Sequence, residues 1–416
     1  MAHADLPAHA QAPIGQLAVP EAVDLSRRGV RARRNPGLAL AGAGLALLWS
    51  AAAICFVAAT LEVLHTRGGL GVGLRNVLLS WDSNFNLGIA GSGYHWDPAI
   101  QGAQNPAFFP AYPLLVRFAH LAGVPWLPAA VGVSVACQVG AAALLARSLA
   151  LDGERASRVL AAVGLFLAFP AGVYAVLGYS TSLTVLCALG AVVACRRGRL
   201  WLAALVAGAG TAVSDLGLAV SGALVLSELA AVGWRGALDR RRLGRLALSL
   251  WGVVAFSAFL WVRFGDPIAW YTAIRGWLPT VPPWTVVGRV VTLAPVRATF
   301  VGVIGHPTEK WLMFTQDAAF VLVFAGVLLW AAARGVGFGP ALALGALSFL
   351  AVNVQGARYG PEYSAIRLLY PAAAVLLTDE RLRRLVTGRA APVLLALLAA
   401  WSGVWLVLLA HGMWVE

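Results

Sequence analysis

Apolar runs of roughly 20 residues recur along most of the chain, and short segments between them hold most of the charged residues. A run of that length crosses a hydrocarbon layer of ~30 Å as a helix that satisfies its own backbone hydrogen bonds. The pattern therefore predicts an all-α polytopic membrane protein. About eleven transmembrane helices are expected, at 38–59, 126–146, 158–177, 181–195, 200–213, 216–232, 246–262, 312–333, 339–354, 366–378 and 391–411.

Composition and charge support this interpretation. Of the 416 residues, 60% are hydrophobic and 12% are charged, whereas soluble proteins average about 25% charged residues. The formal net charge of +13 comes largely from arginine clusters at 26–34, 196–199, 234–245 and 379–384. These clusters fall at alternate connections, so the positive-inside rule places them in the cytoplasm. No basic segment is interleaved with stacking aromatic residues, which argues against nucleic acid as a partner.

The order of the runs suggests how the chain is organised. Residues 1–36 are rich in Ala, Pro and Arg and are expected to form a disordered cytoplasmic tail, with 37–416 as the integral membrane domain. The first span then leads into a long extracytoplasmic loop at 61–125, and loops of that length are usually functional. Within it, 108–123 is apolar but broken by prolines, which predicts an interfacial or re-entrant segment. A second extracytoplasmic loop is expected at 263–312.

Asp82 is the strongest candidate for chemistry. It follows the first span, lies between Trp81 and Phe85, and precedes several glycines. A carboxylate just outside a span can act as a general base towards a lipid-borne substrate. The alternative is a helix cap, because Ser80 to Ser83 also forms a plausible helix start.

Four cationic residues are candidates for substrate contact. Arg358 and Arg367 flank a late extracytoplasmic loop, at the depth of a lipid phosphate group, which arginine can bind through two parallel hydrogen bonds. The alternative for both is snorkelling to lipid headgroups. Arg117 and His120 lie in the interrupted apolar segment and face either the site or the bilayer surface.

The remaining candidates are two acids and two aromatic residues. Asp266 stands in a Gly-Asp-Pro turn signal and could also belong to a donor or metal site, while Asp215 lies between two apolar runs in a predicted external turn. A divalent cation held by Asp82 and Asp266 is possible, but residues this far apart in sequence define no ligand set, and no metal ligand is assigned. Trp81 and Tyr112 could stack on sugar rings or belong to the interfacial aromatic belt.

Several motifs together resemble one family. They are Trp81-Asp82, Ile89-Ala90, Gly93-Tyr94, Phe108-Phe109-Pro110, Tyr112-Pro113-Leu114, Gly265-Asp266-Pro267, Ala269-Trp270, Trp277 and Arg367-Leu368-Leu369-Tyr370-Pro371. This set resembles the PIG-V-like mannosyltransferases of the polytopic C-type glycosyltransferase superfamily. The resemblance implies inverting transfer of a sugar, with mannose expected, from a polyprenyl-phosphate donor to a lipid-linked or cell-envelope acceptor on the extracytoplasmic face. It also implies that Asp82 is the general base.

The chain departs from that family at two places. A Tyr-Ser/Thr-Glu-Ser stretch is represented here by Tyr179-Ser180-Thr181-Ser182, which lacks the acid, and the arginine of the next outer turn is missing near Ser214. Losing both charges together avoids leaving either one alone. The alternative function is therefore a non-catalytic scaffold or a glycolipid transporter that retains the fold. A transporter would need polar positions near the bilayer midplane, whereas the polar groups here cluster at the outer ends.

The chain is rich in arginine, and Lys310 is its sole lysine. This composition suggests a bacterial source with a high GC content, so the membrane is expected to be a plasma membrane.

Overall fold

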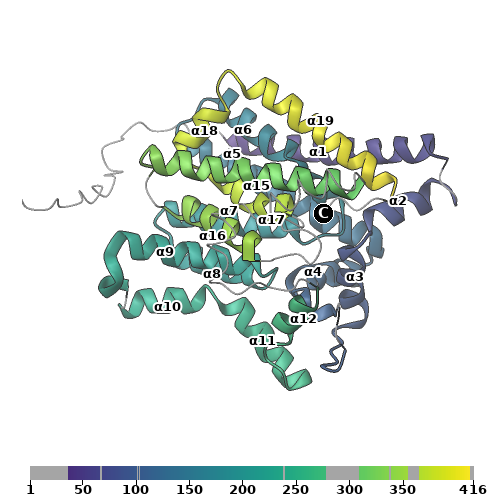
Figure 1. Cartoon of the computed structure of the whole chain (residues 1–416), viewed down its shortest axis with the longest axis horizontal. Coiled ribbons are helices and arrows are strands. Elements are labelled where there is room, and N and C mark those ends of the chain that lie inside the picture. The colour runs from purple at the N-terminus through teal and green to yellow at the C-terminus, as the bar shows by residue number, and fades with distance from the viewer. Residues whose placement is uncertain are drawn as a thin grey trace, which may run out of the picture. The chain divides into compact units, whose positions relative to one another are not determined.

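The computed structural model describes residues 36–65, 68–100, 102, 104–237, 239–277, 309–336, 339–354 and 365–412. Throughout these residues the secondary structure is helical, without a strand (Figure 1). The predicted disordered tail lies outside the described residues, apart from Pro36, at which the first helix begins.

Four helices are long and apolar enough to cross a membrane. They are α1 (Pro36–Val63), α5 (Trp126–Leu151), α9 (Leu216–Ala237, whose spanning part ends at Gly233) and α19 (Ala391–Ala410). Two bent pairs bring the number to six if each pair is a single span. These pairs are α6 (Ala156–Ala168) with the 3-10 helix η2 (Pro170–Val176), bent by 76°, and α10 (Arg240–Leu248) with α11 (Trp251–Phe264), bent by 58°.

Five further apolar helices complete the bundle, namely α7 (Thr181–Arg196), α8 (Leu200–Thr211), α15 (Glu309–Ala333), α16 (Pro340–Val354) and α17 (Ala365–Leu376). Their apolar parts are 10 to 17 residues long over the described region, shorter than the ~20 residues that a full crossing needs. The protein is thus a polytopic membrane protein, but the expected count of about eleven spans is not confirmed.

The predicted first loop is folded into short helices. It contains α2 (Leu70–Leu78), α3 (Asp82–Ser92), the 3-10 helix η1 (Asn105–Ala107) and α4 (Ala111–Leu121). The interrupted apolar segment at 108–123 forms α4, which packs against α3 and α5. From the predicted second loop the structure describes α12 (Ala269–Trp277); most of the remainder, 278–308, lies outside the described residues.

Close helix packing uses small residues, as expected for helices in lipid. α5 packs against α1, α6 and α7, and a Cβ added at Gly42 of α1 would lie 2.9 Å from the Ala142 carbonyl oxygen of α5. A further close approach joins α8 to α9, where a Cβ added at Gly217 would overlap the Gly210 carbonyl oxygen. These contacts fix the scaffold on which the site is built.

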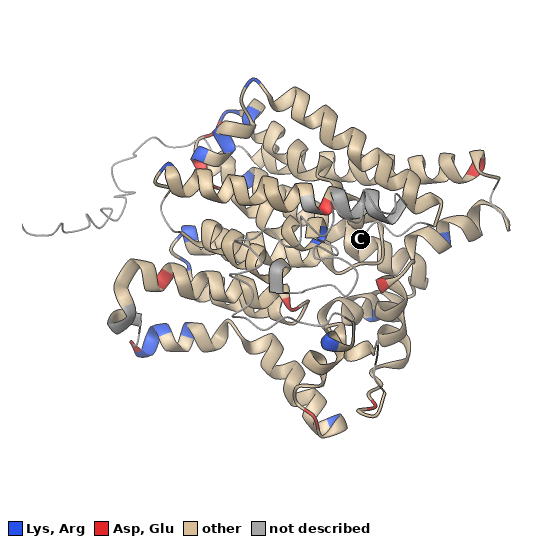
Figure 2. Cartoon of the chain, viewed as in Figure 1, with Lys and Arg blue, Asp and Glu red and all other residues tan. Residues whose placement is uncertain are grey.

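Arginines gather at one end of the bundle (Figure 2). The basic helices α10 and α18 (Glu380–Val386) lie at that end, and α2 and α3 lie towards the opposite one (Figures 1 and 2). Arg196, at the end of α7, donates to the Thr378 carbonyl beside α18, so the cluster at 196–199 belongs to the same end. The first-loop helices and the basic clusters are therefore separated along the bundle.

Candidate functional site

Asp82 opens α3 and lies in its first turn, where the helix dipole favours a negative charge. The preceding residue, Trp81, has φ 46° and ψ −113°, a backbone conformation that a bulky side chain rarely adopts. The Asp82 backbone N–H donates to the Tyr179 hydroxyl at 3.3 Å. Asp82 is thus held at a helix start, beside a strained residue of the kind that concentrates at functional sites.

The Asp82 carboxylate forms an ion pair with Arg367 of α17, 285 residues further along the chain. Arg367 donates from Nη1 to Oδ2 of Asp82 at 2.6 Å, with side-chain exposures of 19% for the arginine and 16% for the acid. The guanidinium carbon lies 5.5 Å from the Tyr179 ring centroid and 5.8 Å from that of Tyr174, within the range of cation–π attraction. Two aromatic rings and one carboxylate therefore position this arginine.

Buried hydrogen bonds hold the segment around Tyr179 against the first loop. Ser134 of α5 donates to the Tyr179 carbonyl at 2.9 Å, and the Tyr112 hydroxyl lies 2.9 Å from the Ser134 hydroxyl. On the other side, Asn86 of α3 donates to the Gly178 carbonyl at 3.4 Å. The position of α3, and with it that of Asp82, is consequently tied to α5 and to the start of α7.

The ion pair lines a cavity of about 130 Å³. Two carboxylates, one guanidinium, one amide and several hydroxyls face it, together with two phenylalanines. The lining residues come from α3, from η1 and the segment after it, from the start of α7, from the turn between α8 and α9, and from α17. They are Asp82, Asn86, Ala107, Phe108, Phe109, Ser180, Thr181, Thr184, Val213, Ser214, Asp215, Leu216, Arg367, Leu368 and Pro371.

Both departures from the family pattern lie in the wall of this cavity. Thr181 occupies the position of the missing acid, and Ser214 lies in the turn that lacks the arginine. In that region the Thr184 and Ser214 hydroxyls are 3.3 Å apart. The adjacent Asp215 accepts the Leu216 backbone N–H at 2.9 Å. A neutral hydroxyl contact thus joins α7 to the α8–α9 turn, and a carboxylate lies beside it.

Three of the predicted site residues, Asp82, Asp215 and Arg367, are brought together around the cavity. Arg358 lies outside the described residues. The other predicted residues do not line the cavity, for reasons that differ from one residue to the next.

Arg117 is exposed, and its side chain donates to the Ala90 carbonyl at 3.3 Å. His120 stacks on Trp126 with ring centroids 3.7 Å apart, and its Nδ1 lies 3.0 Å from the Val124 carbonyl. These contacts match the interfacial alternative for both residues rather than a contact with the cavity.

Asp266 accepts the Ile268 N–H at 3.0 Å, which is the turn role that its Gly-Asp-Pro context indicated. Tyr112 is fully buried and bonds to the Ala130 carbonyl and to Ser134, so it supports the first loop instead of offering a face to a sugar. Trp81 packs at the edge of the main core.

The aromatic residues that line the cavity were not among the predicted site residues. Phe108 and Phe109 do so, although the sequence marked them only as part of a motif. Phe108 stacks on Phe85 with centroids 4.8 Å apart, and its carbonyl accepts the Tyr94 hydroxyl at 2.8 Å. Burial raises the pKa of Tyr94, so this hydroxyl stays protonated and remains a donor.

Among the residues that the structure describes, the cavity offers fewer ligands than a metal site needs. Within the described ranges, no group of three or more His, Cys, Asp or Glu side chains is placed to hold a metal ion. Asp82 and Asp215 are the carboxylates that line the cavity there, and the predicted partner Asp266 is engaged in its own turn. No chemical step is therefore assigned to a metal.

The fold and the site define a polytopic helical membrane protein with a carboxylate–arginine pair in a polar cavity at the end remote from its basic clusters. Residues 65–262, just under half of the chain, match the family described as Mannosyltransferase (PIG-V). The resemblance to the PIG-V-like mannosyltransferases is thereby confirmed over these residues. The matched segment includes Asp82 and ends before Arg367. No curated protein and no solved structure matches the chain.

Proposed function

We propose that the protein transfers mannose from a polyprenyl-phosphate donor to a lipid-linked or cell-envelope acceptor, with inversion at the sugar carbon. The single observation that carries the proposal is the Asp82–Arg367 pair in the wall of one cavity. Transfer of a sugar from a polyprenyl phosphate needs a base for the acceptor hydroxyl and a cationic partner for the leaving phosphate, and this pair supplies one of each. The match of residues 65–262 to a mannosyltransferase family supports the choice of sugar.

In the proposed reaction, the Asp82 carboxylate takes the proton of the acceptor hydroxyl. The acceptor oxygen attacks the anomeric carbon of mannose from the side opposite the phosphate, and the bond from that carbon to the phosphate oxygen breaks. The bonding electrons leave with the lipid phosphate. One direct displacement inverts the configuration, so the product carries the opposite anomeric configuration to the donor.

Arg367 stabilises the departing phosphate in this scheme. Without a substrate, its guanidinium and the carboxylate compensate each other across 2.6 Å. A donor phosphate competes with Asp82 for the guanidinium, and a charge-assisted bond to the phosphate strengthens as negative charge develops there. The same exchange frees the carboxylate to face the acceptor hydroxyl. Tyr174 and Tyr179 keep the arginine in place meanwhile.

The other cavity residues suit recognition of a sugar. Asp215 and the hydroxyls of Ser180, Thr181 and Thr184 offer hydrogen-bond partners to sugar hydroxyl groups. Phe108 contributes an apolar surface on which the less polar face of a sugar ring can pack. These assignments concern binding, and none of these residues is given a proton-transfer role.

We further propose that the cavity faces away from the cytoplasm. The arginine clusters of α10, α18 and the end of α7 lie at the opposite end of the bundle (Figure 2), and the positive-inside rule makes that end cytoplasmic. In this orientation the amino terminus is cytoplasmic. The arginine-rich, nearly lysine-free composition supports the further proposal that the membrane is a bacterial plasma membrane. A donor flipped to the outer leaflet would reach Asp82 from the lipid side.

The rival function is a non-catalytic scaffold or glycolipid transporter, and the neutral Thr184–Ser214 contact favours it, because the family's charged residues are absent there. The test incubates the purified protein with labelled polyprenyl-phosphate mannose and a native lipid extract. We expect a labelled product of inverted anomeric configuration. No product with any acceptor in the extract would favour the scaffold, and a product with retained configuration would exclude the direct displacement.

A further inference from the structure

A second hollow lies apart from the candidate site. This apolar groove, of about 250 Å³, is formed by α6, α15, α17, α18 and α19. Each of these helices contributes one wall, with side chains such as Phe166, Phe324, Ala373, Leu385 and Leu398. No residue of the groove also lines the Asp82 cavity. The groove reaches α18, which lies at the basic end of the bundle (Figures 1 and 2).

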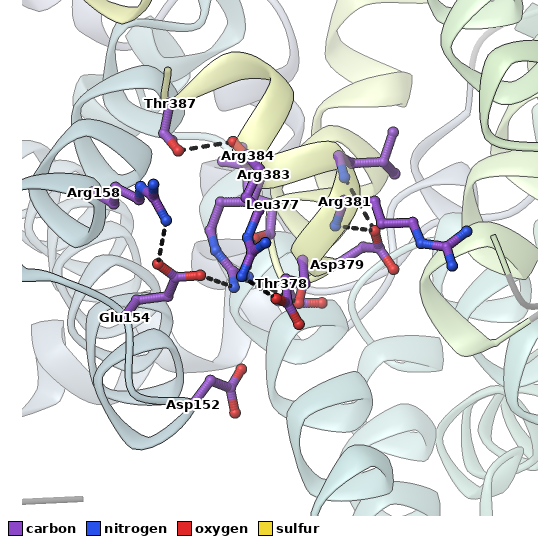
Figure 3. A network of polar contacts seen from close by, with 12 residues as sticks. Asp152, Glu154, Arg158, Leu377, Thr378, Asp379, Arg381, Arg383, Arg384 and Thr387 are labelled. Carbon is purple, nitrogen blue, oxygen red and sulfur yellow. Dashed lines mark hydrogen bonds and ion pairs between the residues drawn. The ribbon is translucent and has the colours of Figure 1, made fainter. Parts of the chain in front are cut away.

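The inner side of α18 is fixed by a buried polar network (Figure 3). Arg383 is 1% exposed and donates to Glu154, in the turn between α5 and α6, at 2.7 Å. It also donates to the Thr378 carbonyl at 3.2 Å. Asp379 caps the helix by accepting the backbone N–H groups of Arg381 and Leu382. This network holds α18 in place, with the buried Leu382 in the groove wall.

The outer side of α18 combines charge with exposed apolar surface. Arg384 has a side chain that is 59% exposed, although it also contacts Glu380, and its neighbour Leu385 is 53% exposed. Arg381 reaches the end of α15, where it donates to the Arg334 carbonyl at 2.6 Å. Arg389 is exposed in the turn before α19. Arg381 and Arg384 thus lie on α18, which forms one wall of the groove, and Arg389 lies in the turn that follows it.

We propose that this groove binds one acyl chain of an anionic phospholipid, whose phosphate lies against Arg384 and Arg389. An apolar slot with an exposed leucine at its mouth suits a hydrocarbon chain, and arginine suits phosphate because it can donate two parallel hydrogen bonds. Basic pockets between helices on the cytoplasmic side of membrane proteins bind anionic headgroups. A zwitterionic lipid would fill the groove without matching the charge of its rim.

The lipid in this proposal is distinct from the sugar donor. The groove shares no residue with the Asp82 cavity, and α18 lies at the opposite end from α3 (Figure 1). A donor whose phosphate is at Arg367 could not place the same phosphate at Arg384. The inference therefore stands whether or not the protein transfers mannose.

The test measures lipid retention by native mass spectrometry of the full chain purified in mixed micelles with equal amounts of phosphatidylglycerol and phosphatidylcholine. We expect the wild type to retain phosphatidylglycerol preferentially. An arginine near a membrane surface contributes about 1 kcal/mol to anionic-lipid binding, which is about fivefold in affinity. The double variant Arg384→Gln with Arg389→Gln should therefore lower the preference by about 25-fold.

The matched control is Arg240→Gln with Arg241→Gln, two exposed arginines on α10 at the same end but outside the groove. This pair should keep the wild-type preference. Equal loss in both double variants would show diffuse attraction without a site, and would overturn the proposal. Equal retention of the two lipids by the wild type would overturn it as well.

The groove itself is tested by Ala373→Trp, which fills it from α17, and by Leu398→Trp, which fills it from α19. Either folded variant, checked by its melting profile, should lose both lipids. Wild-type retention in a folded variant would show that the acyl chain does not lie in this groove, and would contradict the proposal even if the arginine variants behaved as expected.

Discussion

Replacing Arg367 with glutamine tests the carboxylate–arginine pair in two independent ways. The substitution removes the charge that faces Asp82 at 2.6 Å and leaves a shorter, neutral side chain that can still donate a hydrogen bond. Exposed ion pairs contribute about 0–1 kcal/mol, whereas removal of one partner from a fully buried pair costs about 3–5 kcal/mol. With 16% and 19% exposure, this pair falls between these cases. The helix dipole still favours the Asp82 charge, so we expect a loss of about 2 kcal/mol in stability.

The effect on transfer should exceed the effect on stability. Loss of a group that stabilises developing negative charge lowers kcat by about 10²–10³, and we expect a decrease of that size for Arg367→Gln. Arg367→Lys keeps the charge but loses the parallel hydrogen bonds, so its stability should stay near that of the wild type while transfer falls about tenfold.

The assay combines thermal unfolding in detergent with transfer of labelled mannose at saturating donor. A double variant, Asp82→Asn with Arg367→Gln, separates the two roles because it removes both charges. It should recover most of the lost stability and remain inactive. Our reasoning would be refuted if Arg367→Gln transferred mannose at more than a tenth of the wild-type rate, or if the double variant regained transfer together with its stability.

Three further predictions concern groups that hold the site or the basic end. Gly178→Ala places a Cβ 3.1 Å from Ser83 Cβ, so we expect a loss of about 1 kcal/mol in stability. Because this contact displaces α3 and with it Asp82, mannose transfer should be roughly tenfold slower. Unchanged transfer would contradict this. Tyr179→Phe removes the hydroxyl that accepts the Asp82 backbone N–H at 3.3 Å, and it should slow transfer by about threefold to fivefold. Unchanged transfer by this variant would show that the bond does not position Asp82. Burial raises the pKa of Glu154, but the Arg383 hydrogen bond and neighbouring positive charges lower it overall. The stability that this lowered pKa contributes is present above the ordinary pKa of 4.5 and is lost as the pH falls below it. Glu154→Gln should therefore flatten the acid side of a plot of melting temperature against pH. An unaltered plot would contradict the assignment.

The helices were predictable because their lengths are set by the hydrocarbon layer. The run predicted at 126–146 became α5 (Trp126–Leu151), and the run at 158–177 became α6 with η2. The sequence could not show the 76° bend inside the second run, nor whether apolar helices such as α8 (Leu200–Thr211) cross completely. Hydrophobicity alone does not distinguish a short crossing helix from a buried one.

The site was predictable only in part. Asp82 and Arg367 were both chosen from the sequence, but the ion pair between them depends on packing across 285 residues. Tyr112 shows the opposite case, because an aromatic residue near a membrane surface looks the same in sequence whether it faces a ligand or, as here, the core. Phe108 and the hydroxyls of α7 reach the cavity through tertiary packing alone.

Transfer of labelled mannose from polyprenyl-phosphate mannose by Asp82→Asn tests the central claim most directly, with Asp97→Asn as the matched control. Asp97 is an exposed acid of the same loop whose carboxylate accepts the Ala99 N–H at 2.9 Å, a bond that asparagine can also accept. Removal of a general base lowers turnover by about 10²–10⁴. We predict a loss of that size for Asp82→Asn and wild-type turnover for the control, whereas wild-type turnover by a folded Asp82→Asn protein would contradict the assignment of Asp82 as the base.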